Sequence, residues 1–245
     1  MTDTVHVYSV LVMRTASGRP VSDLTARARI LDAAIAVFAD QGGAASVRAI
    51  ATVAGVSPGL ITHHFGTKEA LKAECDQRVL DAYTELKMAG IANPAGSMDL
   101  VNNTDPEQVA RISTISTYMM RAFLEGGETA REFYRRLVAQ MAEVINVAAA
   151  QGMVRAECTD AMHLRYMAGS TLGFMLVQFV LDPPSDNQGF FQSVTADPAL
   201  LDAMLDVLTN GAFANDQVLT AYRAANGGQT DHQKGTQQKK ENNVQ

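Results

Sequence analysis

The stretch SVRAIATVAGVSPGLITHHF, residues 46–65, decides how this chain is interpreted. It holds two short segments of helical character joined by AGVS. Gly55 permits the positive φ angle that a tight corner between two helices requires. Ser57 is a favourable N-cap, and Pro58 then occupies the first helical position, where its missing N–H is not needed. The sequence therefore predicts two short helices that meet at a sharp turn.

The second of these short helices has two unlike faces. Ile61 and Phe65 lie four residues apart, and we expect both to point inward. The positions expected to point outward are Gly59, Leu60, Thr62 and His63. A glycine near the start of a helix makes it less stable than alanine would, by roughly 1 kcal/mol. That cost favours a helix whose first turn lies against another surface, as a recognition helix does in the major groove of DNA.

Helical periodicity extends over most of the remaining chain. In residues 24–43 the apolar stripe comprises Ile30, Leu31, Ala34, Val37 and Phe38. A longer helix is expected from Thr67 to about Met88, and further helices over residues 106–125, 127–151, 160–181 and 197–213. Strand-like alternation is absent from the sequence, so we expect an all-α fold. Residues 1–22 and 226–245 lack helical periodicity, and we expect a flexible arm and a disordered tail.

The composition is that of a soluble globular protein. The chain has 245 residues, 47% of them apolar and 19% charged, with a net charge of −6. An acidic chain argues against a nucleic-acid partner, but between Leu24 and Lys72 five basic side chains outnumber three acidic ones. Cys75 and Cys158 lie far apart and suit a reducing cytoplasm. The most apolar run, 167–181, is shorter than a membrane span.

The segment RARILDAAIAVFADQGGAASVRAIATVAGVSPGLITHHFGTKEALKAEC resembles the DNA-binding domain of the TetR/AcrR family of bacterial transcriptional regulators. The resemblance rests on VRAIATVAGVS, the short helix that ends in HHF, and the TKEAL that follows. It implies a three-helix DNA-binding domain over residues 23–84 and a helical domain for ligand binding and dimerisation over residues 85–225. The family usually has an aromatic residue where this chain has Thr62.

The resemblance also implies which residues meet DNA. Ser57, Thr62, His63 and His64 are expected to contact phosphates or line the groove. Gly59 and Leu60 are expected to lie closest to the base edges. Because neither Gly59 nor Leu60 carries a hydrogen-bonding side chain, Arg48 becomes a candidate for base or backbone contact. Lys68 begins the next helix, where a cation interacts unfavourably with the helix dipole. A contact with a phosphate would account for a lysine at this position. His63 and His64 are adjacent rather than four apart, so no metal site is expected.

The carboxyl-terminal half offers weaker signals. The candidates for an effector pocket are Tyr118, Met119, Phe123, Phe133, Tyr134, Leu137 and Met141. An ordinary hydrophobic core is the alternative, because methionine and aromatic residues at helical spacing serve both purposes. Residues 160–181 are apolar on nearly all sides, which predicts a helix buried in an intersubunit bundle or in the core of one subunit.

The function expected is that of a ligand-responsive homodimeric repressor, cytoplasmic, that binds a pseudo-palindromic operator in double-stranded DNA through residues 46–65. An unknown small-molecule effector is its other partner, with no membrane and no cofactor. An all-α enzyme is one alternative, although no catalytic triad or phosphate-binding loop is present in the sequence. A helical adaptor that binds another protein through residues 160–181 is the other.

Overall fold

The computed structural model describes residues 26–93, 106–183, 190 and 197–226. These residues form helices, and no strand is found among them, in agreement with the all-α prediction. The expected arm and tail lie outside the described residues, apart from Asn226. The chain divides into two compact units, Met1–Ala196 and Asp197–Gln245, which are described separately.

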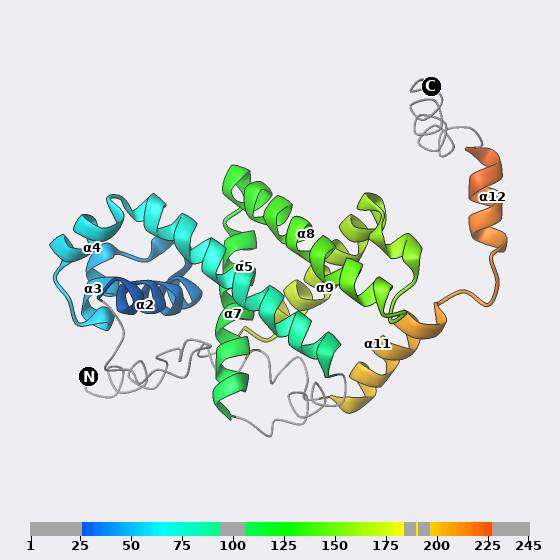
Figure 1. Ribbon diagram of the computed structural model, residues 1–245, viewed down its shortest axis with the longest axis horizontal. Helices are drawn as coiled ribbons and strands as arrows, with labels where there is room; N and C mark the ends of the chain where they lie inside the picture. Colours follow the sequence, from blue (N-terminus) through cyan, green and yellow to red (C-terminus); the bar gives the residue numbers. More distant parts are fainter. Residues whose placement is uncertain (1–25, 94–105, 184–189, 191–196, 227–245) are drawn as a thin grey trace. The chain divides into compact units, whose positions relative to one another are not determined.

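The first unit begins with a small helical group, which comprises α2, η2, α3 and α4, and continues with longer helices (Figure 1). Its helices are α2 (Ala26–Gln41), η2 (Gly42–Ala44), α3 (Val47–Ala54), α4 (Pro58–Phe65), α5 (Lys68–Ala92), α7 (Pro106–Leu124), α8 (Gly127–Ala150), η3 (Ala156–Thr159) and α9 (Ala161–Leu181). Helix α5 continues four residues beyond the predicted end at Met88. It also runs through the expected domain boundary at residues 84–85, so one helix belongs to both predicted domains.

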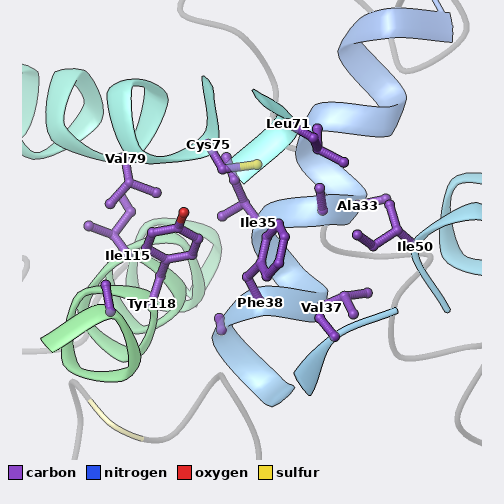
Figure 2. Packing of buried hydrophobic residues seen from close by; sticks show 14 of the residues in the cluster. Ala33, Ile35, Val37, Phe38, Ile50, Leu71, Cys75, Val79, Ile115 and Tyr118 are labelled. Carbon is purple, nitrogen blue, oxygen red and sulfur yellow. The ribbon is translucent and has the colours of Figure 1, made fainter. Parts of the chain in front are cut away.

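Helix α2 lies at the centre of the hydrophobic core. The predicted residues Ile30, Ala34, Val37 and Phe38 are buried, whereas Leu31 is only partly buried. Ala33, Ile35, Ala36 and Ala39 are buried too, so the helix is covered on more sides than its amphipathic stripe predicts. Figure 2 shows Phe38 of α2 among side chains of α5 and α7, including Cys75, Val79, Ile115 and Tyr118. The same core therefore joins the small helical group to the rest of the first unit.

Helix α9 buries little of its apolar surface within the single chain. Its buried residues are Leu164, Ala168 and Phe179, whereas Tyr166, Val180 and other apolar side chains are exposed. The helix has 21 residues, close to the predicted range 160–181, and by length and composition alone it could cross a membrane. A single helix of this kind is weak evidence of a membrane span, because helices that pack in soluble proteins meet the same criteria.

The second unit contains α11 (Pro198–Asn210) and α12 (Gln217–Ala225). Asp197 caps α11 by accepting hydrogen bonds from the N–H groups of Ala199 and Leu200. Helix α11 corresponds to the helix predicted over residues 197–213. Helix α12 was not expected as a separate element, because its nine residues are too few to show a clear period.

Candidate DNA-binding interface

The turn between α3 and α4 is built from local hydrogen bonds. Ser46 Oγ accepts from the Ala49 N–H at 3.1 Å, and Ser57 Oγ accepts from the Leu60 N–H at 3.3 Å. Gly55 ends α3 in the left-handed conformation, with φ +65°. Each helix therefore has its own cap, and the predicted corner at Gly55 and start at Pro58 are confirmed.

The two faces of α4 differ as the sequence predicts. Ile61 and Phe65 are buried in the core, where the side chains are 2% and 6% exposed. The opposite surface is open to solvent at Ser57, Gly59, Thr62 and His63, with Leu60 and His64 partly buried. Six of the expected DNA contacts therefore lie together on one short helix and its cap.

Gly59 is not required by the packing of the described residues. A β-carbon at this position would have one neighbour within 4 Å, Ser57 Oγ at 3.9 Å, which is an ordinary contact distance. Its φ angle is not in the positive range where glycine is needed. The fold thus leaves room for a side chain where the sequence has none.

Polar side chains of α4 contact other groups of the same helix. Thr62 Oγ1 donates to the carbonyl oxygen of Pro58 at 3.4 Å, one turn earlier. The rings of His63 and His64 pack edge to face, with centroids 5.4 Å apart. Among the described residues, no group of three or more His, Cys, Asp or Glu side chains could hold a metal ion.

Two cations flank α4 and differ in their surroundings. Arg48 is exposed on α3, and no partner for its guanidinium is found in the described part of the chain. Lys68 Nζ donates to the carbonyl oxygen of Gly43 at 2.6 Å, which holds the start of α5 against η2. An ammonium has three N–H donors, so Lys68 keeps others for an external acceptor. The hydrogen bond between Lys68 and the Gly43 carbonyl was not predicted from the sequence.

Arg27 also holds the small helical group together. Its guanidinium forms an ion pair with Glu74 of α5 and lies over the Phe65 ring, 4.8 Å from the centroid. It therefore joins α2, α4 and α5. Sequence reasoning could not find this role, because the partners lie far along the chain.

A buried polar cluster connects α5 with α7. Tyr118 Oη donates to Asp76 Oδ1 at 2.7 Å, and Lys72 Nζ binds the same oxygen at 2.7 Å. The ammonium also lies 4.8 Å from the centroid of the Tyr118 ring. Burial raises the pKa of Tyr118 well above its usual value, so its hydroxyl remains a donor. Figure 2 shows the Tyr118 side chain between α7 and α5, beside Phe38. The cluster ties α7 to the helix that follows the helix-turn-helix.

The structure brings the expected pocket residues together as packed contacts between helices. Tyr118, Met119, Phe133 and Leu137 are buried, Met141 is 9% exposed, and Phe123 and Tyr134 are partly buried. Phe123 packs edge to face on Phe133, with ring centroids 5.5 Å apart. Tyr134 Oη donates to the Arg165 carbonyl oxygen at 2.9 Å, which joins α8 to α9. Their role in binding an effector stays a prediction.

The amino-terminal part of the chain, residues 30–75, matches the family described as bacterial regulatory proteins, tetR family. Residues 110–214 match the tetracyclin repressor-like C-terminal domain. The chain is also 30% identical over 204 residues to the HTH-type transcriptional regulatory protein RaaS of Mycobacterium tuberculosis, covering 83% of this chain and 94% of that protein. The chain belongs to the TetR family. It is therefore a DNA-binding transcriptional regulator, and the family is not one of enzymes.

A solved structure shows a partial similarity of shape. The fatty acid degradation regulator FadR of Bacillus halodurans is 21% identical, with a TM-score of 0.47, covering 69% of this chain and 95% of that chain. The two TetR-family matches together include α3, α4, α8, α9 and α11 in full and most of α7, whereas α12 begins at Gln217, after the second match ends.

Proposed function

We propose that this TetR-family regulator is a cytoplasmic, ligand-responsive homodimer that represses transcription by binding a pseudo-palindromic operator. The observation that carries the proposal is the exposed surface of α4, where Gly59 leaves space that no side chain of the described residues fills. A groove wall or phosphate can approach the backbone closely at that point. Two such helices in a dimer would reach successive major grooves, about 34 Å apart.

The apolar surface of α9 supports the dimer. Met162, Tyr166, Val177 and Val180 are 53% to 77% exposed and fall on one helical stripe. Gly173 lies on the same stripe, and a β-carbon there would meet nothing within 4 Å. A second helix could therefore lie close to α9. Surface of this kind is usually covered by another protein surface. We assign this surface of α9 to the interface with a second copy of the chain.

Operator binding is tested with two variants, the first of which should weaken DNA binding without making the protein less stable. Fragments of the source genome are selected with the full-length protein, and the affinity for the selected site is measured by fluorescence anisotropy. Gly59→Ala should keep or raise the melting temperature, because alanine favours a helix by roughly 1 kcal/mol. It should nevertheless weaken DNA binding at least tenfold, because the methyl group fills the space at the contact surface.

Arg48→Ala should weaken binding and lower the salt dependence by about one phosphate contact. Arg131→Ala is the matched control, since Arg131 is an exposed arginine of α8. The proposed contact surface is wrong if both Gly59→Ala and Arg48→Ala bind the selected site as tightly as the wild type.

The dimer is tested by light scattering on a Val180→Glu variant. A buried, unpaired carboxylate in the interface should raise the dimer dissociation constant at least a hundredfold, giving monomers at micromolar concentration. Met153→Glu is the control, because Met153 is a 47% exposed apolar residue in the turn after α8. A Val180→Glu protein that stays dimeric would exclude α9 from the interface.

A further inference from the structure

The middle of α7 is unusually polar for a buried helix. Ser113, Thr114, Ser116 and Thr117 are all buried, at 0% to 6% exposure. A buried hydroxyl without a hydrogen bond costs about 1–3 kcal/mol. Thr114 Oγ1 meets this need by donating to the Ala110 carbonyl oxygen at 3.0 Å. Thr117 Oγ1 is inaccessible to solvent and has no partner in the described structure.

Arg121 lies one turn after Thr117 on the same face of α7, and its Nε is also buried without a hydrogen-bond partner. Its guanidinium lies 5.3 Å from the centroid of the Phe179 ring of α9. Among the described residues, no carboxylate forms an ion pair with it. A buried guanidinium N–H without an acceptor costs more than a neutral donor. Two unsatisfied groups therefore occur at adjacent turns of one helix.

The surroundings of Arg121 are aromatic on one side. Phe179 packs edge to face on Phe190 at 5.2 Å between centroids, and both rings are buried. On another side, the stem of Arg121 lies beside Gly42, the first residue of η2 after the end of α2, where an added β-carbon would lie 3.8 Å from both Arg121 Cδ and Glu125 Oε1. Arg121 therefore lies between the aromatic pair and the start of the helix-turn-helix.

A purely structural role explains part of this arrangement. A cation in the last turn of α7 interacts favourably with the helix dipole, and a guanidinium over an aromatic ring is attractive. Neither effect supplies an acceptor for Nε, and neither concerns the hydroxyl of Thr117. The groups left over are an N–H of a guanidinium and a hydroxyl that can donate. A carboxylate satisfies both, because its two oxygens match the fork of a guanidinium.

We propose that Thr117 Oγ1 and Arg121 Nε bind the carboxylate of an apolar effector, whose hydrocarbon part packs beside Phe179. This assignment rests on the ligand response proposed above and names the chemical class of the ligand. It places the anionic end of the ligand beside the end of α2. The effector therefore contacts a side chain that touches the DNA-binding part directly.

The test uses straight-chain probes of equal length with different end groups. Decanoate, decanol and decylamine are titrated into the full-length protein below the concentrations at which they form micelles. Binding is followed by calorimetry and by the melting temperature. Decanoate should bind at least tenfold more tightly than the other two. Carboxylates from hexanoate to tetradecanoate are measured as well, so that chain length does not hide the effect.

Two variants separate ligand binding from structure. Thr117→Val keeps the shape but removes the unpaired hydroxyl, so it should raise the melting temperature of the free protein and weaken decanoate binding severalfold. Arg121→Met should weaken decanoate binding at least tenfold, to the level of decanol, whereas Arg121→Lys should retain part of the affinity. Arg131→Met, on the exposed face of α8, is the matched control and should bind decanoate normally.

The proposal is overturned if no carboxylate of the series binds, if decanoate binds no better than decanol, or if Arg121→Met binds decanoate as the wild type does. The same protein samples are titrated with the selected operator without any probe. Retained operator binding in such a case shows that the DNA-binding function stands and that only the ligand class is wrong. Loss of operator binding by the wild-type protein itself would instead refute the proposed function.

Discussion

Asp32 of α2 and Asp76 of α5 are two carboxylates that are almost equally buried, at 9% and 7% exposure. They differ in their hydrogen-bond partners. Asp76 accepts from Lys72 and from Tyr118, each at 2.7 Å. Asp32 Oδ2 has no hydrogen-bond partner in the described structure. Burial raises the pKa of Asp32 to about 6, and the nearby guanidinium of Arg78 offsets part of that rise. The contribution of a buried charge to the stability of the fold therefore depends on its partners, and not on its burial alone.

The two carboxylates also share a neighbourhood. Burial raises the pKa of the Cys75 thiol, and the charges of Asp76 and Asp32 both add to this effect. Cys75 lies on α5 within the core that joins α2 to α7. The paired carboxylate fixes α7 against α5 at this junction, whereas the unpaired one weakens the same region. Changing each of them should therefore shift stability in opposite directions.

The largest effect is expected for Asp76→Ala. The substitution leaves the Lys72 ammonium buried without its partner, which costs about 3–5 kcal/mol of unfolding free energy. Urea denaturation of the full chain measures this loss. Glu132→Ala removes an exposed ion pair with Arg135 and should leave the denaturation midpoint unchanged. Equal midpoints for Asp76→Ala and the wild type would show that the buried cluster does not hold α5 and α7 together.

The sequence predicts the helix-turn-helix and fails at this cluster for one physical reason. Ser46, Gly55 and Ser57 act on backbone groups within four residues, so their spacing alone indicates the caps. Asp76 and Tyr118 are 42 residues apart, and only the folded chain brings them together. Tyr118 was a candidate for an effector pocket or for the core, and its interhelical hydrogen bond to Asp76 was not predicted.

The same difference between local signals and long-range contacts explains which features of the candidate DNA-binding site could be predicted. The outward face of α4 follows from the period of the helix, which Ile61 and Phe65 establish on the other side. The bond between Lys68 and the Gly43 carbonyl could not be predicted, because it depends on how the start of α5 meets η2. Helix α9 is apolar on nearly all sides, and this pattern indicates that its surface is covered but not by which chain.

A gain in stability is expected for Asp32→Asn, and it should depend on pH. The folded-state pKa of Asp32 is about 6, whereas an aspartate in an unfolded chain has a pKa of about 3.9. Since the folded protein holds this proton more tightly, the contribution of Asp32 to stability falls as pH rises from about 4 to about 6. At pH 7 the variant should be more stable by roughly 2–3 kcal/mol.

Denaturation of the wild type and of Asp32→Asn is compared from pH 4 to pH 8. The difference between the two should shrink most of the way toward zero as the pH falls to 4, where Asp32 is protonated in the folded state and about half protonated in the unfolded state. A difference that stays constant over this range would show that the gain has another origin, such as a hydrogen bond made by the new amide. A less stable Asp32→Asn protein at pH 7 would show that the carboxylate has a partner after all.

The smallest of the three effects is expected for Tyr118→Phe. The ring keeps its packing against Phe38 and Phe133, and only the hydrogen bond to Asp76 is lost. Because Asp76 remains paired with Lys72, the loss should be about 1.5 kcal/mol, the lower range for a hydrogen bond to a charged group. Tyr134→Phe is the comparison, since it loses a bond to a neutral carbonyl at the less buried contact with Arg165.

A double-mutant cycle distinguishes the hydrogen bond from a general effect on packing. In an Asp76→Ala background, Tyr118→Phe should cost less than in the wild type, and the difference measures the coupling between the two residues. Alanine is suitable because it removes both oxygens that can accept the hydrogen bond from Tyr118. If the two losses simply add, Tyr118 stabilises α7 through its ring alone. In that case the Asp76 carboxylate is stabilised by Lys72 alone, within α5. The hydrogen bond from Tyr118 would then contribute nothing to the connection between α7 and α5.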